Sequence, residues 1–187
     1  MLFCLSSGVT AQNLIKRGFG SKHRTLVGFK GGIINQTDYH AVPVSDTLKE
    51  YKDRTRIGLS FQIFFDIPVG SKLFSTLSFE MQDIHVVAER HEMLDVSLYL
   101  KYAIYKEAKK LAWRPFVGIG WAYLGDGAHL EKSSFTTLKV GLEGVFYTHR
   151  RYAYMGEIMV YGSIDGGNDA YDVTFGPVVL FRLGVLY

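Results

Sequence analysis

Cysteine is almost missing from this chain, since Cys4 is the only one among 187 residues. A single thiol forms no intrachain disulfide and no thiolate zinc site. Long apolar runs are missing too: no stretch of about 18 residues lacks charged or strongly polar side chains, which excludes a membrane-spanning helix. Neither sign of charge dominates, because the net charge is only +3 and is spread along the chain. This distribution gives little support to nucleic-acid binding.

Glycine and aromatic residues are abundant. The chain contains 20 Gly, 13 Phe, 12 Tyr and 2 Trp but only 4 Pro. Glycine exceeds its usual share of roughly 7%, yet it accompanies aromatics rather than a Pro and Ser bias, so low-complexity disorder is excluded. The length fits one folded domain.

The first residues differ from the rest of the chain. Residues 1–9 are mildly apolar, and Val9-Thr10-Ala11 places small residues where signal peptidase requires them. We therefore interpret residues 1–11 as a truncated signal peptide and residues 12–187 as a single domain. The alternative is a frayed terminus, because no Lys or Arg precedes Lys16.

Strict alternation of apolar and polar residues organises the remainder, as in strands of a sheet whose two faces meet different surroundings. It is clearest over residues 57–67, where one parity is wholly apolar: Ile57, Leu59, Phe61, Ile63, Phe65 and Ile67. The same period governs residues 94–104, 113–123, 138–146 and 173–187, and less cleanly 27–33, 73–81 and 152–160. The sequence therefore predicts eight strands.

Alternation alone does not say which face points inward, because a soluble lipocalin-like barrel and a membrane barrel have inverse patterns of one period. Side-chain volume decides between them. About five bulky side chains from each of eight strands would overfill an eight-stranded barrel. The apolar parity must therefore face outward, and so much apolar surface is stable only in lipid. We predict an all-β fold, an eight-stranded antiparallel up-and-down transmembrane β-barrel.

Chain length and connections agree with this fold. Eight strands leave about 22 residues for each strand and its connection, and a tilted strand needs about 9 to 11 to cross a bilayer. We expect long outer loops at residues 36–54 and 83–92 and a short periplasmic turn at residues 68–71. Aromatic residues near strand ends would form interfacial girdles, namely Tyr102, Trp113, Tyr123, Tyr152 and Tyr187.

Four segments of the chain resemble those of known families. The carboxyl terminus resembles the assembly signal of bacterial outer-membrane barrels, with apolar residues at alternate positions and a terminal aromatic: Val179, Phe181, Leu183, Val185 and Tyr187. Residues 94–102 and 113–120 are similar to the paired motifs of the PorT-like outer membrane β-barrel domain family of Bacteroidota, and residues 27–32 resemble its first strand. This chain has Asp95, Val96 and Ser97 where the family usually has Glu, Ile and Pro.

These resemblances imply the outer membrane of a Gram-negative bacterium. They also imply partners: outer-membrane lipid, the barrel assembly machinery, and envelope or secretion proteins beside which the barrel would act. No nucleic-acid partner is expected.

Charged residues fall on the parity that should face the lumen. The predicted inward set is Lys30, Glu80, Asp95, Lys101, Arg114, Lys139, Glu143, Glu157 and Arg182. Charges removed from water must pair, or each costs several kcal/mol. We interpret this set as a salt-bridge network that plugs the lumen. The alternative is a narrow ion path or a switchable gate.

An enzyme is the main alternative of another class, because some small outer-membrane barrels modify lipids. His85 and His91, with Glu89 and Glu92, would suit a metal site or a base with its orienting acid, but exposed loop residues explain them more simply. The oxygen ligands of residues 165–169 likewise suit a hairpin loop better than a calcium site. We predict no catalytic residues, no metal and no cofactor, and keep a lipid-modifying enzyme as the alternative.

Two local features qualify the strand pattern. Pro177 lies within a predicted strand of a barrel without edges, so we expect a bulge at Gly176-Pro177. Residues 106–110 have a helix-like local sequence, and we interpret them as a basic periplasmic turn or one short helical turn. With a plugged lumen, specific binding would fall to connections, chiefly residues 36–54 and the basic segments Lys109-Lys110 and His149-Arg150-Arg151.

Overall fold

A computed structural model describes residues 25–35, 38–45, 50–54, 57–86, 89–105, 110–125, 133–148 and 152–187. The predicted signal peptide lies outside these ranges. Within them no helix is long and apolar enough to cross a membrane. The secondary structure described is instead made of strands.

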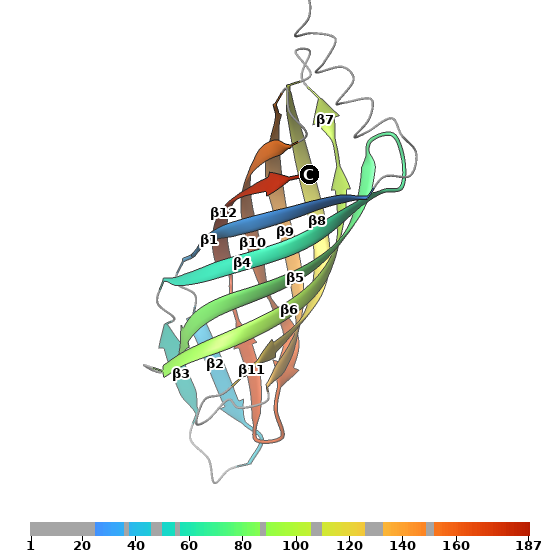
Figure 1. The fold of residues 1–187 in the computed structure, drawn as a ribbon. Helices are drawn as coiled ribbons and strands as arrows, with labels where there is room; N and C mark the ends of the chain where they lie inside the picture. The colour runs from blue at the N-terminus through green and yellow to red at the C-terminus, as the bar shows by residue number, and fades with distance from the viewer. Residues whose placement is uncertain are drawn as a thin grey trace, which may run out of the picture.

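Eight long strands form a closed barrel (Figure 1). They are β1 (Leu26–Ile34), β4 (Gly58–Pro68), β5 (Leu73–Val86), β6 (Glu89–Tyr102), β8 (Leu111–Leu124), β9 (Ser134–Tyr147), β10 (Ala153–Gly167) and β12 (Val178–Leu186). Each pairs antiparallel with its neighbours, and β12 closes the barrel by pairing with both β1 and β10. The predicted eight-stranded antiparallel barrel is confirmed.

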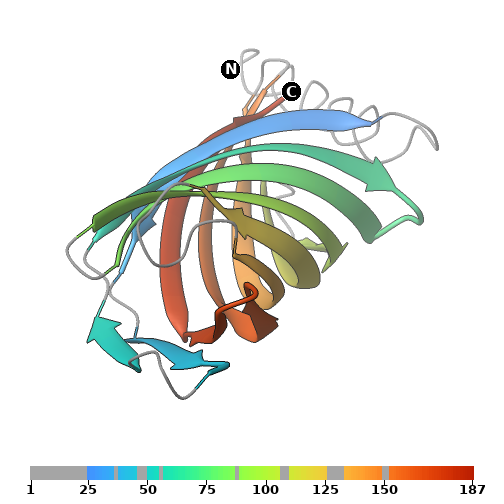
Figure 2. The ribbon, with the colours of Figure 1, turned by 90° about the horizontal axis from the view of Figure 1, so that it is seen from below.

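Four shorter strands lie at the barrel ends. β7 (Ile104–Tyr105) pairs with β8, and β11 (Tyr171–Phe175) pairs with β10. β2 (Asp38–Pro43) pairs with β11, and β3 (Tyr51–Arg54) pairs with β2. We call β11, β2 and β3 the outer extension; its strands project beyond the barrel at one end (Figures 1 and 2). The predicted loop 36–54 therefore contains two strands, because the backbone edge of β11 offers hydrogen bonds that β2 completes.

The apolar parity faces outward, as predicted. On β4, Leu59 and Phe61 are 50% and 56% exposed, whereas Ser60 and Gln62 are buried. The same alternation holds on the other barrel strands, where the outward positions are mainly Leu, Ile, Val, Phe, Trp and Tyr. Such an exterior is stable only in lipid.

The apolar band matches a bilayer in height. From Ile57 to Ile67 the outward positions of β4 are apolar, and these 11 residues span about 34 Å of strand, or about 24 Å across the membrane at a tilt of roughly 45°. Next to this band, the outward positions of β5 and β6 are occupied by Asp83 and Glu92, which lie opposite each other in the strand ladder. The band therefore ends there.

The predicted loop at residues 83–92 was wrong. The β5–β6 ladder continues through this segment, with Val86 opposite Glu89, and only residues 87–88 lie between the strands. The segment contains no Gly, Pro or Asn to stop the ladder, and Ile84, Val86 and Val87 favour strand.

The two barrel ends differ in their connections. Val27 and Tyr187 exchange backbone hydrogen bonds, so β1 begins and β12 ends at the same rim. That rim also carries the short β4–β5 turn, residues 69–72, whereas the opposite rim carries the outer extension. Short turns are periplasmic in outer-membrane barrels. We therefore call the two rims the periplasmic end and the outer end.

The bulge expected at Gly176-Pro177 corresponds to a break between β11 and β12, with a cis peptide bond. Inward positions slip by one there: Val173 and Phe175 contact the interior on one side, Val178 and Leu180 on the other. A bulge in β10 between Ser163 and Asp165 lies at the same level. Tyr161 lies opposite Val178 and Gly167 lies opposite Asp172, so β10 has the same register with β12 as with β11. The extra residue in β10 and the break between β11 and β12 therefore compensate each other.

Candidate functional site

Among the residues whose side chains the structure describes, ten charged ones are buried inside the barrel, and each of the eight barrel strands supplies at least one. They are Lys30 on β1, Asp66 on β4, Glu80 on β5, Asp95 and Lys101 on β6, Arg114 on β8, Lys139 and Glu143 on β9, Glu157 on β10 and Arg182 on β12. Five are cations and five are carboxylates. The group is therefore neutral as a whole.

Glu143 is the centre of the half nearer the periplasmic end. Its carboxylate accepts hydrogen bonds from Lys30, from Arg114 Nε at 2.5 Å and from Lys101 Nζ at 3.3 Å. Asp66 lies 2.8 Å from Arg114 Nη1 and 3.1 Å from Lys101 Nζ, and it accepts a 2.5 Å hydrogen bond from the Thr76 hydroxyl. Both carboxylates thus share the same two cations.

Arg182 is the centre of the half nearer the outer end. Its guanidinium donates to Glu157 and lies 2.7 Å from Glu80 Oε1. Lys139 Nζ lies 2.7 Å from Asp95 Oδ1 and 3.7 Å from Glu80 Oε2. Lys30 contacts both Glu143 and Glu157 and so joins the two halves. All ten groups belong to one continuous chain of ion pairs, which we call the charge network.

Several of these pairs bridge the lumen. Arg114 on β8 meets Asp66 on β4, and Arg182 on β12 meets Glu80 on β5; in each pair the strands are three positions apart around the barrel. Lys30 on β1 and Glu143 on β9 have the same separation. Because the barrel has eight strands, such pairs extend across its interior rather than along one wall.

Aromatic rings fill space beside the cations. The Phe64 ring centroid lies 4.5 Å from Lys30 Nζ and 4.7 Å from Lys101 Nζ. Tyr161 and Tyr99 lie 5.2 Å and 5.9 Å from Lys139 Nζ. Cation–π contacts of this kind are worth more when desolvated, so the rings stabilise the buried cations as well as occupying volume.

Apolar clusters lie on both sides of the charge network. Along β9, the inward residues run from Phe135 through Lys139 and Glu143 to Val145. The outer cluster contains Ile34, Ala41, Met93, Tyr99, Phe116, Ala122, Leu124, Phe135, Met159, Tyr161, Tyr171, Val173, Val178 and Leu180. The periplasmic cluster contains Leu26, Phe64, Ala112, Val145, Tyr147, Ala153, Met155 and Leu186. Apolar side chains therefore border the network on both sides along the barrel.

The structure brings all nine predicted lumen residues into this network and adds a tenth, Asp66, which the sequence analysis missed. The predicted set had five cations but four carboxylates, so it was one negative charge short. Asp66 has the same parity as Ser60 and Gln62, so the alternation of β4 could have assigned it to the lumen. Hydroxyl partners were also missed: Ser60 donates to Glu80 at 2.6 Å.

The predicted assembly signal forms the outward face of β12. Phe181, Leu183 and Tyr187 are exposed, and Leu183 is 75% exposed; Val179 and Val185 are half-buried. Tyr187 also lies near Tyr152, with ring centroids 6.4 Å apart, at the periplasmic end where a girdle was expected.

The other candidate sites are only partly described. His85 is opposite Arg90 in the β5–β6 ladder, but the side chains of Glu89, His85 and His91 lie outside the described part. In the 165–169 segment, residues 165–167 lie in β10, and the turn to β11 begins at Asn168, which accepts hydrogen bonds from the backbone amides of Ala170 and Tyr171, both at 2.9 Å. Among residues with described positions, no three His, Cys, Asp or Glu gather as metal ligands. Residues 106–109 and 149–151 lie outside the described ranges, and Lys110 is exposed.

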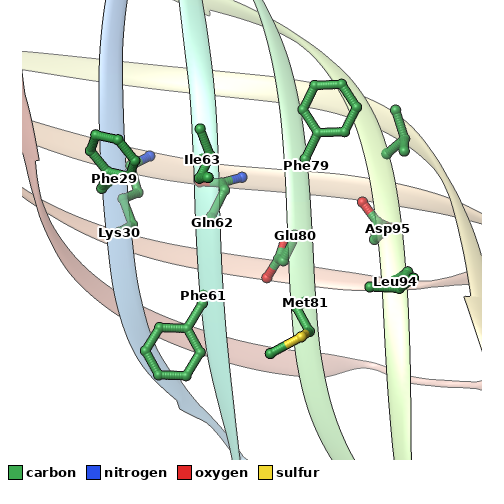
Figure 3. A pocket seen from close by; sticks show the side chains of 11 residues that line it. Phe29, Lys30, Phe61, Gln62, Ile63, Phe79, Glu80, Met81, Leu94 and Asp95 are labelled. Atoms are coloured by element: carbon green, nitrogen blue, oxygen red, sulfur yellow. The ribbon is translucent and has the colours of Figure 1, made fainter.

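A hollow of about 450 Å³ lies on the outer surface of the wall, across β1, β4, β5 and β6 (Figure 3). One outward row contains Phe29, Ile63 and Phe79, and another contains Phe61, Met81 and Leu94. Between them lies the register row Lys30, Gln62, Glu80 and Asp95, which is buried on the inner side. The hollow is apolar and faces lipid, so it matches an acyl chain rather than a polar ligand.

Solved structures of small outer-membrane barrels share this fold. Neisserial surface protein A (NspA) aligns over 87% of this chain and 95% of its own, with a TM-score of 0.57 at 11% identity. The outer membrane protein OprG from Pseudomonas aeruginosa aligns over 88% and 97%, with a TM-score of 0.55 at 12% identity. No protein-family model and no curated protein matches the sequence.

The closed antiparallel barrel and its lipid-facing exterior together define the location. In lipid only helices and closed barrels satisfy all backbone hydrogen bonds, and barrels of this type belong to outer membranes. The protein is an outer-membrane β-barrel. This agrees with the location predicted from the sequence, the outer membrane of a Gram-negative bacterium.

Proposed function

We propose that this protein is an envelope structural or interaction protein whose lumen is plugged. The observation that carries the proposal is the charge network: ten buried side chains from all eight strands form one neutral chain of ion pairs across the interior. Moving an ion past it would require breaking pairs that cross the lumen. Buried charges without partners cost several kcal/mol each, so the closed arrangement is strongly favoured.

A plugged barrel leaves its rims for specific work. The outer extension is held on the barrel by buried contacts, since Ala41 and Val173 belong to the outer cluster. Connections on a rigid scaffold are where binding usually resides. The resemblance to the PorT-like family adds a role accessory to secretion, and the terminal residues Val179 to Tyr187 would be read by the barrel assembly machinery.

A lipid-modifying enzyme is the alternative function from another class. It would use His85 or His91 as a base near the outer membrane surface. A narrow pore is the alternative within the same class, and bilayer recordings test it separately.

The experiment combines lipid analysis of a deletion strain with crosslinking of the intact barrel in cells. We expect unchanged lipid acylation and crosslinks to envelope proteins. An altered acyl pattern that wild type restores, but His85→Ala or His91→Ala does not, would instead establish the enzyme. His40→Ala is the matched control, because His40 lies on the outer extension and pairs with Glu50.

A further inference from the structure

Four buried polar atoms on the inner wall of β4 and β5 have no hydrogen-bond partner among the residues that the structure describes. They are Gln62 Oε1, Ser78 Oγ, Glu80 Oε2 and Gln82 Nε2, and the residues that carry them are at most 3% exposed. Buried polar groups in folded proteins are nearly always hydrogen-bonded, either to the protein or to an ordered water. The four atoms therefore indicate a small ligand of the charge network.

The strand ladder brings these four residues together, and we call them the Glu80 group. Gln62 lies directly opposite Glu80, and Figure 3 shows the two side chains on adjacent strands. Ser78 and Gln82 are the inward residues on either side of Glu80 along β5. Diagonal neighbours on one face of a sheet are about 7–8 Å apart, so one small molecule can connect polar side chains at these positions.

Neighbouring polar groups are directed elsewhere. Ser97 lies opposite Ser78 in the ladder, but its hydroxyl donates to Asp95. Lys139 Nζ lies 2.7 Å from Asp95 Oδ1 and 3.7 Å from Glu80 Oε2, and the second distance is too long for a hydrogen bond. At a separation beyond about 3.5 Å, a water can bridge two polar groups.

The unpaired atoms also select the chemistry of the ligand. Gln62 Oε1 and the ionised carboxylate of Glu80 only accept hydrogen bonds. Gln82 Nε2 only donates, because the amide oxygen of Gln82 accepts from the Tyr161 hydroxyl. The Gln82 N–H groups would repel a metal cation, and Glu80 would repel an anion. A water molecule both donates and accepts, so it satisfies both kinds of atom.

We propose that ordered water binds in the Glu80 group and bridges Glu80 to Gln62, Ser78 and Gln82. A buried water typically makes about three hydrogen bonds, and this group offers four unpaired atoms. This inference rests on the proposed function, because the water completes the charge network that plugs the lumen. It is a bound part of the plug and differs in this from the mobile water of an open pore.

Nuclear magnetic resonance of the full-length barrel in micelles detects such a water through the side-chain amide protons of Gln82. We expect cross-peaks between these protons and water that have opposite signs in NOESY and ROESY spectra, which identifies bound water rather than proton exchange. Ser78→Ala should weaken these cross-peaks. Ser75→Ala is the matched control, because Ser75 lies on the outward parity of the same strand, and it should leave them unchanged.

Urea titration of the same variants gives a second measurement. Ser78→Ala should lower the urea midpoint, because it removes a hydrogen bond to the bound water. In a dry site it would instead raise the midpoint, because it removes a buried hydroxyl that has no partner.

Missing bound-water cross-peaks at Gln82 in wild type would overturn the proposal, as would a Ser78→Ala midpoint that is unchanged or raised. Bilayer recordings on wild type keep the two proposals distinguishable. A barrel that lacks the bound water but does not conduct contradicts only this inference, whereas a conducting barrel contradicts the plugged lumen.

Discussion

Glu143 shows why the interior charges occur as a network rather than as separate pairs. Three cations surround its carboxylate, and two of them, Arg114 and Lys101, also contact Asp66. Burial of an ion costs several kcal/mol, which a single partner rarely offsets. Sharing partners gives each charge more than one opposite neighbour, so the set is stable only when complete.

Removing the charge of Glu143 should therefore destabilise the barrel strongly. In Glu143→Gln the side chain keeps its size, but Lys30, Lys101 and Arg114 lose their common carboxylate. Breaking a buried pair costs about 3–5 kcal/mol, and we expect a loss of that order in the free energy of unfolding, measured by urea titration in micelles.

The matched control is Glu92→Gln, since Glu92 is exposed on the outward face and surface charges contribute about 0–1 kcal/mol. Equal stability of Glu143→Gln and wild type would contradict the network's structural role.

Individual residues were predicted unevenly from the sequence. Parity alone assigned nine network residues to the interior, because alternation determines the face of a strand. It could not assign partners: the pairing of Arg114 with Asp66 depends on the order and stagger of strands around the barrel. Contacts between side chains on opposite walls of the lumen produce no periodic pattern in the sequence.

At the level of elements, long strands were predictable and short ones were not. Residues 57–67 alternate along β4, whereas β2 and β3 have only six and four residues, too few to establish a period. β2 forms because β11 supplies a neighbouring edge. The end of β5 was missed for a related reason, since its outward residues turn polar beyond the apolar band while the ladder continues.

Strands β2 and β3 of the outer extension should be dispensable for barrel closure. β1 and β4 pair directly up to Ile34 and Gly58, so the wall is complete without β2 and β3. Replacing residues 38–54 with a short Gly-Ser linker should leave a barrel that migrates faster on gels unless boiled. Wild type and the variant are folded side by side and compared on gels. A variant without this heat-dependent mobility would show that β2 and β3 are part of the folding core.

A charged side chain should be tolerated outside the apolar band but not within it. Ile63 is exposed midway along the apolar residues of β4, whereas Val44 is exposed on the outer extension. An arginine at the bilayer midplane costs about 2–4 kcal/mol and near an interface about 0–1. Ile63→Arg should therefore lower the stability in vesicles by about 2–4 kcal/mol, while Val44→Arg changes it little. Equal losses of stability in the two variants would contradict the position assigned to the apolar band.

At the scale of the whole molecule, three layers succeed one another inside the barrel. The periplasmic cluster, the charge network and the outer cluster follow one another along the barrel interior. An eight-stranded barrel has an interior just wide enough for side chains, so the bulky apolar side chains of the other parity face lipid. The volume argument from sequence predicted this outward apolar face correctly, because it depends only on strand number and side-chain size.

The most direct measurement is planar-bilayer recording of the purified wild-type barrel, with a large porin as the positive control. A lumen bridged by the ion pairs of Arg114 with Asp66 and Arg182 with Glu80 should give no steady conductance. Stable nanosiemens-scale channels would contradict the account, because they require an open path through the charge network and both apolar clusters.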